Sequence, residues 1–223
     1  NYPGYALASQ WYDVDIMDAE AVIGIAKAEE IDAIVGCGSD FILPTIGKVV
    51  DALGLLGPSY ESSVVSSNKL LMKNAFAREG VRTAAYKEVF SEESMLMAAT
   101  ELGYPVVLKI VDGSGSKGVV VCRDETTLRA AYAEVQSYTH ASSMVLEQFV
   151  DGEEFGAQAY VRDGKLQFVM LHGDLIYRGA SGIPVGHFAP YSSEKSLQAD
   201  VEEQLRKCIA ALQIDNCAIN ADF

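Results

Sequence analysis

The chain has 223 residues, of which 49% are hydrophobic and 22% are charged, and its formal net charge is −14. This length allows one large domain or two small ones, and the composition is ordinary for a soluble globular protein. The negative charge argues against nonspecific binding to nucleic acid or to an anionic membrane surface, because both need a basic face. No apolar run approaches the ~20 residues of a membrane span.

Helix and strand patterns alternate over residues 1–66 and predict a parallel sheet, as in a doubly wound α/β domain. The expected elements are a helix over 18–30, a strand over 31–36, a helix from 39 or 40 to 53, and a short strand over 54–57. The chain begins with a loop rather than with the strand that usually opens such a domain. We therefore expect this domain to be partial, with further strands preceding Asn1 in the native protein.

A second unit is predicted over residues 67–142, and a more antiparallel one over 143–223. The second unit has helices over 69–78, 91–102 and 124–136, an extended segment over 81–89 and a strand–loop–strand hairpin over 104–122. The third has strands over 143–150, 155–162, 165–172 and 216–223, an irregular segment over 173–191 and a long helix over 194–212. The Asp163-Gly164 pair is a strong hairpin signal between two of these strands. The fold class is therefore α/β followed by α+β.

The four cysteines are widely scattered, at positions 37, 122, 208 and 217, and none forms a CxxC pair. Each lies in or beside an apolar run. This usage predicts a reduced, cytoplasmic protein with buried thiols.

The tip of the predicted hairpin, Gly113-Ser-Gly-Ser-Lys-Gly118, carries almost no side chains. Such a loop lets backbone N–H groups surround an anion. Lys109 before it and Lys117 within it add positive charge where a phosphate would lie. The hairpin therefore predicts a nucleotide-binding site.

Three known phosphate-binding loops fit this stretch less well. The dinucleotide-binding loop needs a helix directly after it, whereas Val119–Cys122 favours a strand. A Walker loop would end in Gly-Lys-Ser or Gly-Lys-Thr, and Gly118 is followed by valine. The kinase glycine-rich loop precedes its lysine and needs H-R-D and D-F-G motifs, which this chain lacks.

The remaining pattern is a strand lysine, a glycine hairpin and, about 30 residues on, two glutamates separated by a turn. Its motifs are S-N-K-L-L-M-K around Lys69, Y-P-V-V-L-K ending at Lys109, D-G-S-G-S-K-G, E-Q-F-V from Glu147, D-G-E-E ending at Glu154, and N-A-D-F around Asp222. In this order the motifs resemble the ATP-grasp superfamily of carboxylate–amine (or thiol) ligases, which includes the carbamoyl-phosphate-synthetase-like ligases. The resemblance covers about residues 66–223 and implies an ATP-grasp fold.

The resemblance also implies a role for each motif. The two phosphate-side lysines are Lys69 and Lys109, and Glu154 accepts from the ribose hydroxyls, since Glu153 faces the other way. The movable lid over the phosphates comprises Gly113, Ser114, Gly115, Ser116 and Gly118. The hinge around the adenine ring comprises Glu147, Gln148, Phe149 and Val150.

Asp222 resembles the first magnesium carboxylate of this superfamily, and hard oxygen ligands suit that ion. The companion Glu-x-Asn motif is absent before Phe223, so we expect the native protein to continue beyond it. Arg178 and His187, with His172 and Ser181 nearby, lie in a segment that the resemblance places over the acceptor substrate. For His187, a loop histidine bonded to backbone is an equal alternative.

The implied reaction is the ATP-dependent activation of a small carboxylate as an acylphosphate, which an amine or similar nucleophile then attacks. The implied cofactors are ATP and Mg²⁺, or Mn²⁺ in its place. The expected partners are these small molecules, with a homodimer possible and with neither nucleic acid nor membrane. The alternatives are a nucleotide-binding module without ligase activity, a small-molecule kinase of the same fold, and an α/β binding protein without nucleotide.

Overall fold

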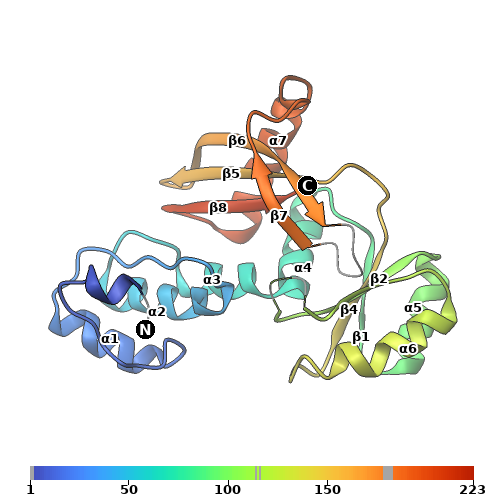
Figure 1. Ribbon diagram of the computed structural model, residues 1–223, viewed down its shortest axis with the longest axis horizontal. Coiled ribbons are helices and arrows are strands. Elements are labelled where there is room, and N and C mark those ends of the chain that lie inside the picture. The colour runs from blue at the N-terminus through green and yellow to red at the C-terminus, as the bar shows by residue number, and fades with distance from the viewer. Residues whose placement is uncertain (1–2, 114, 116, 178–182) are drawn as a thin grey trace.

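The computed structural model describes residues 3–113, 115, 117–177 and 183–223 of the chain. Figure 1 shows a group of helices at the N-terminal end, one sheet backed by α5 and α6, a second sheet backed by α7, and α4 between them. None of the helices in the described part of the chain combines the length and apolarity needed to cross a bilayer.

The described residues before α4 form helices and loops only. The elements are η1 (Pro3–Ala6), α1 (Ala19–Ala28), η2 (Asp40–Ile42), α2 (Leu43–Leu53) and α3 (Tyr60–Ser67). Their small core is formed by Ile23, Ala26 and Val49. Helix α3, which the sequence pattern did not predict, begins where the Ser59 hydroxyl accepts from the Ser62 N–H at 3.1 Å.

The two strands expected at 31–36 and 54–57 do not form, and no parallel sheet is present among the described residues. A strand exists only when its N–H and C=O groups pair with a neighbouring strand. Here Val35 is 90% exposed and Leu56 is 79% exposed, so both segments lie without such a neighbour. The Cys37 thiol, expected to be buried, is exposed for the same reason.

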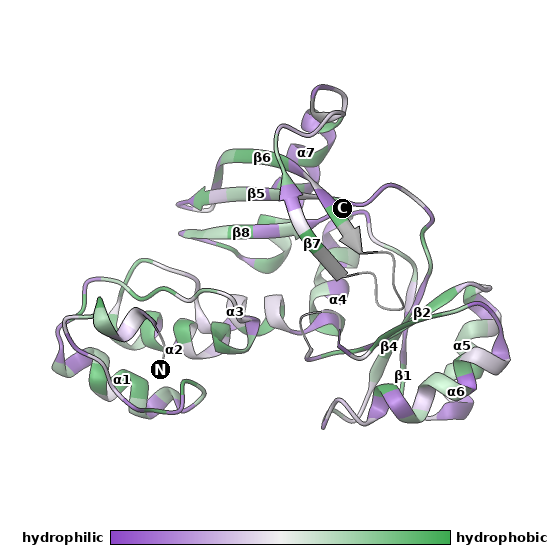
Figure 2. Cartoon of the chain, in the orientation of Figure 1, coloured by the Kyte–Doolittle hydropathy of each residue, from purple (hydrophilic) through white to green (hydrophobic). Residues whose placement is uncertain are grey.

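The first sheet is antiparallel, in the order β1-β4-β2-β3. Its strands are β1 (Tyr86–Val89), β2 (Val106–Ile110), β3 (Val119–Cys122) and β4 (Met144–Gln148). Helices α5 (Glu92–Leu102) and α6 (Glu125–Gln136) pack on one face, and Figure 2 shows polar and apolar residues alternating along α6. The predicted hairpin is confirmed, because Val106 pairs with Cys122 and Lys109 pairs with Val119.

The second sheet is also antiparallel, in the order β7-β6-β5-β8. Its strands are β5 (Phe155–Arg162), β6 (Lys165–Tyr177), β7 (Ile183–Phe188) and β8 (Cys217–Asp222), and α7 (Glu194–Leu212) packs against it. The prediction of an irregular segment over 173–191 is wrong in part, since β6 continues to Tyr177 and β7 pairs with it. Pro184 lies in β7, which is an edge strand, where the missing N–H is tolerated.

Helix α4 (Lys69–Glu79) joins the two sheets. At its start the Asn68 side chain accepts from the N–H groups of Leu70 and Leu71, and the Lys69 N–H donates to the Val111 carbonyl at 2.8 Å. Its other side packs Ala75 against Ile209 of α7. This packing fixes the lysines of α4 beside the glycine hairpin.

Candidate nucleotide-binding site

Glu147 on β4 lies at the centre of the candidate site. It is only 5% exposed, and its Oε2 accepts from the Lys109 ammonium at 2.9 Å. In the sheet, Lys109 lies opposite Val145 and Glu147 opposite Val107, so both charged side chains emerge on the same face as diagonal neighbours. The hairpin lysine and the strand glutamate predicted from the sequence are thus brought into direct contact.

Lys73 on α4 is a third member of this group, and the sequence analysis missed it. The side chain is buried, and its Nζ lies 3.5 Å from Glu147 Oε1, 2.7 Å from Thr83 Oγ1 and 3.2 Å from the Ala84 carbonyl. Lys69 and Lys73 are four residues apart and therefore share one face of the helix. That spacing was the available signal.

Lys69 begins α4, and its Nζ donates to the carbonyl of Gly113 at the start of the glycine loop. Burial lowers the pKa of the Lys69 ammonium, and the nearby positive charge of Lys109 lowers it further. Burial also lowers the pKa of Lys73 despite the opposing effect of Glu147. Lys73 and Lys109 thus contact one buried carboxylate, and the charge of Lys109 acts on Lys69, so three ammonium groups gather where an anion would be favoured.

The glycine loop turns through backbone conformations that glycine adopts without strain. Gly115 has φ +66° and Gly118 has φ +65°, and the Ile110 N–H donates to the Gly118 carbonyl at 3.0 Å. Any Cβ at Gly118 would lie 2.9 Å from two carbon atoms of the Ile110 side chain. The predicted lid residues Ser114 and Ser116 lie outside the described residues.

The predicted hinge, residues 147–150, leaves β4 toward the second sheet. The Gln148 N–H donates to the Ala85 carbonyl at 2.8 Å, and the Phe149 N–H donates to the Pro105 carbonyl at 3.0 Å. Val150 is 68% exposed, so its apolar side chain is available for contact with a ligand.

Glu154 and Asp222 lie on the opposite, acidic side of the site. Asp222 is the β8 partner of Gly156 on β5, which places it close to Glu154. Burial raises the pKa of Glu154, and the charge of Asp222 adds to the rise. Burial likewise raises the pKa of Asp222, with a further contribution from Asp174. Such converging carboxylates are the oxygen ligands that a hard divalent cation prefers.

The neighbouring Glu153 is paired with Tyr191. Burial raises the pKa of the Tyr191 hydroxyl, and a hydrogen bond with Glu153 raises it further. These residues, with Glu154 and Asp174, line a cavity of about 430 Å³ at the second sheet. Both adjacent glutamates line this cavity, and the expectation that only one of them faces the nucleotide stays a prediction.

His187 lies on β7 and not in a loop, and its Nδ1 is 2.7 Å from Asp174 Oδ1. The alternative of a loop histidine bonded to backbone is therefore wrong. His172 on β6 lies 2.9 Å from the same carboxylate oxygen. Arg178 and Ser181 lie outside the described residues.

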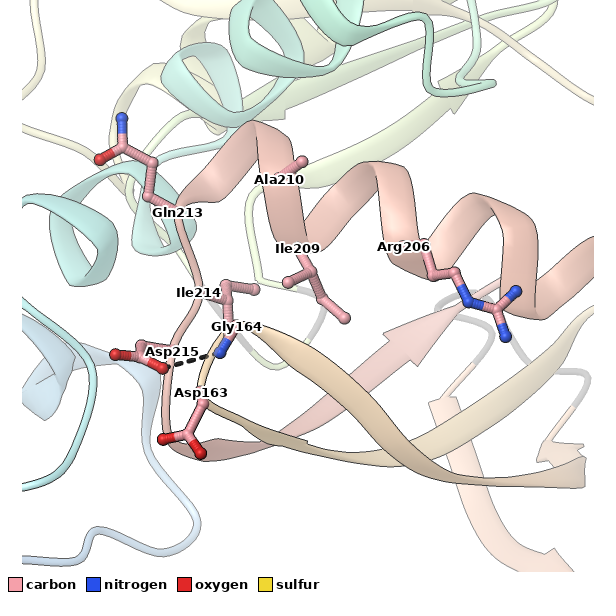
Figure 3. A pocket seen from close by; sticks show the side chains of 8 residues that line it. All are labelled: Asp163, Gly164, Arg206, Ile209, Ala210, Gln213, Ile214 and Asp215. Carbon is pink, nitrogen blue, oxygen red and sulfur yellow. Dashed lines mark hydrogen bonds between the residues drawn. The ribbon is translucent and has the colours of Figure 1, made fainter.

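A second cavity, of about 590 Å³, lies where the end of α7 meets the turn between β5 and β6. Figure 3 shows its lining, in which Asp215 accepts from the Gly164 N–H at 2.8 Å. It contains none of the predicted site residues, and the hydrogen bond there closes the hairpin turn.

Two antiparallel sheets, a glycine-tipped hairpin within the first of them and the lysines of the helix between them define a protein of the ATP-grasp class. The chain belongs to the family described as phosphoribosylglycinamide synthetase, ATP-grasp (A) domain, which matches residues 67–220. The predicted superfamily and its ATP-grasp fold are thereby confirmed.

Individual relatives agree with this membership. A phosphoribosylamine–glycine ligase from Lactococcus lactis is 28% identical over 211 residues, covering 90% of this chain and 50% of the relative. An alanine–anticapsin ligase from Bacillus subtilis is 24% identical over 226 residues, covering 92% of this chain and 47% of the relative. The crystal structure of phosphoribosylglycinamide synthetase from Anaerococcus prevotii has a TM-score of 0.77 and 29% identity, covering 99% of this chain and 55% of that one. The chain thus spans about half the length of the curated relatives it matches.

Proposed function

We propose that the chain binds ATP with its phosphates against the lysines of α4 and β2 and under the glycine hairpin. The observation that carries this proposal is the cluster of Lys69, Lys73 and Lys109, of which the last two contact the buried carboxylate of Glu147. A polyphosphate accepts from these ammonium groups and balances their charge. The first two lysines lie on one face of α4, and the packing of this helix against α7 fixes their position.

Glu147 acts in this proposal mainly as a positioning residue. Its Oε2 accepts from Lys109 and its Oε1 faces Lys73, so the carboxylate holds both ammonium groups in place. The adenine ring would then lie against the exposed Val150, and the ribose hydroxyls would donate to Glu154. Asp222 would hold the magnesium ion, which supplies positive charge to the phosphates when bound.

We further propose that the whole protein is an ATP-dependent carboxylate–amine ligase. A carboxylate oxygen attacks the γ-phosphorus and ADP leaves, giving an acylphosphate. An amine then attacks the acyl carbon, phosphate leaves, and the amine loses a proton. The relatives named as ligases of glycine and of alanine support this reaction class. The ammonium groups of Lys69, Lys73 and Lys109 and the lid N–H groups stabilise the charge that develops on the phosphoryl group.

The three-part division at residues 66 and 142, the cytoplasmic location and the homodimer stay predictions.

The experiment that tests this function is a screen of the full-length protein for ADP release. Amino acids and small carboxylates are supplied singly and in pairs with MgATP. We expect ADP and free phosphate in equal amounts, with a C–N product, for at least one pair. A phosphorylated acceptor in place of free phosphate would identify a kinase, and ATP binding without turnover across the screen would identify a binding module.

A pH dependence of ATP affinity follows from the lowered pKa of Lys69. Above pH ~8 the phosphates are fully ionised, so a falling affinity reports loss of protons from the protein. We expect the ATP affinity to fall as the pH rises toward 10.5, the ordinary lysine pKa. The reason is that the Lys69 ammonium, with its lowered pKa, loses its proton below that pH. Lys69→Arg keeps its charge and should hold its affinity to higher pH. Calorimetric titrations at successive pH values measure this, with Lys165→Arg as control, and identical profiles for wild type and Lys69→Arg would contradict it.

A further inference from the structure

Three ligand-type side chains meet on one face of the β6–β7 hairpin. His172 and Asp174 are two residues apart on β6, so they point to the same side of the sheet. His187 is the direct cross-strand partner of Asp174 on β7. Register alone therefore brings two imidazoles and one carboxylate together.

The contacts within this cluster are close and sheltered. Asp174 Oδ1 lies 2.9 Å from His172 Nδ1 and 2.7 Å from His187 Nδ1, and the Asp174 side chain is 3% exposed. The two rings meet edge to face with centroids 4.9 Å apart. One ligand atom from each residue lies within 4.8 Å of the other two, and no other group of this kind occurs in the described ranges.

We propose that His172, Asp174 and His187 form a binding site for a divalent transition-metal ion of the zinc type. Atoms bonded to one tetrahedral ion at ~2.1 Å lie roughly 3.4 Å apart, so the imidazole-to-carboxylate distances of 2.9 and 2.7 Å need to lengthen only slightly when the ion enters. Imidazole nitrogen selects such ions over Mg²⁺, which prefers oxygen ligands. The His187 side chain is 60% exposed, so the ion keeps positions open for water or a ligand.

The surroundings of His172 support the same assignment. A ligating histidine needs an acceptor for its other ring N–H. The Gln158 amide nitrogen lies 3.3 Å from His172 Nε2 and also donates to Asn220 Oδ1, so a half-turn of both amides together presents the Gln158 oxygen to the ring N–H. Gly156 leaves room for the ring, because a Cβ there would lie 2.1 Å from His172 Cε1.

The bound ion would link β6 to β7 beside the acidic side of the nucleotide site. It differs from the magnesium expected at Asp222 in its nitrogen ligands and in needing no nucleotide. The inference therefore does not rest on the proposed function, and its test contains no ATP.

The test is a titration of the whole chain with Co²⁺ and Zn²⁺ alone. We expect one ion per chain, a Co²⁺ absorption spectrum without thiolate charge-transfer bands, and no displacement by millimolar Mg²⁺. His187→Ala, at an exposed position, should lower the affinity by at least ~100-fold, above the 10–100-fold typical of losing an outer-shell partner. Gln158→Glu should raise it by ~10-fold by giving His172 a carboxylate acceptor.

The matched control is His140→Ala, since the chain has three histidines and His140 is the one outside the cluster. It should bind like the wild type, and Cys37→Ser should do so too. Thermal melts without metal verify that each variant is folded. The proposal is overturned by the absence of one-to-one binding, by equal affinity of wild type and His187→Ala, or by loss of binding in either control.

Discussion

Replacing Lys109 with methionine is expected to weaken MgATP binding by about 100-fold. Methionine keeps the unbranched apolar stem of the side chain and removes the ammonium group, so Glu147 is left facing the phosphates with one cation fewer. Losing one partner of a partly buried charge pair typically costs ~2–5 kcal/mol, and ~2.8 kcal/mol corresponds to 100-fold. Calorimetric titration of the chain with MgATP measures the change.

The control for this variant is Lys165→Met, which removes a lysine at the turn between β5 and β6. Both variants change the net charge equally, so a difference between them reports the site and not the overall field. The Lys109 side chain is 26% exposed, and Glu147 keeps Lys73, so the variant should remain folded. An affinity within about twofold of wild type would exclude Lys109 from the nucleotide site.

Replacing Glu147 with leucine is expected to destabilise the fold by ~3–5 kcal/mol, because Lys73 would remain buried without its carboxylate. Its bonds to Thr83 and to the Ala84 carbonyl remain, but neither partner carries a negative charge. Urea unfolding measures the loss as a lower midpoint at unchanged slope.

A second substitution separates this structural effect from ligand binding. Lys73→Met in the Glu147→Leu background replaces the buried pair by apolar side chains of similar volume, an exchange that is often neutral. We therefore expect most of the stability to return while ATP affinity stays low. If the free energy of unfolding of Glu147→Leu alone lies within ~0.5 kcal/mol of the wild-type value, the carboxylate does not hold the lysines in place.

The elements predicted well from the sequence are those fixed by local signals. Helices α5 and α6 begin at the capping residues Ser91 and Asp124, whose side chains bond the N3 backbone N–H. The hairpin followed from a glycine tip between two β-branched runs. The prediction of strands over 31–36 and 54–57 was wrong. An apolar run forms a strand only when another strand pairs with it, and the local sequence does not show whether such a partner is present.

In the candidate site, too, the residues marked by local signals were predicted and those that depend on distant pairing were not. Lys109 and the glycine loop stood out, because a lysine in an apolar strand and a tip without side chains are unusual locally. The pairing of Lys109 with Glu147 depends on strand register and was not visible. The sequence analysis did not identify Asp174. Its contact with His187 depends on β7, and the glycines and Pro184 of that stretch led to the prediction of an irregular segment.

The measurement that tests the central claim most directly follows oxygen from the carboxylate substrate. The full-length protein is supplied with MgATP, an amine and the carboxylate identified by the ADP-release screen, labelled with ¹⁸O in both oxygens. An acylphosphate intermediate transfers one labelled oxygen to each released phosphate, and mass spectrometry of the phosphate detects it. We predict one ¹⁸O per phosphate, whereas unlabelled phosphate would contradict the proposed carboxylate activation.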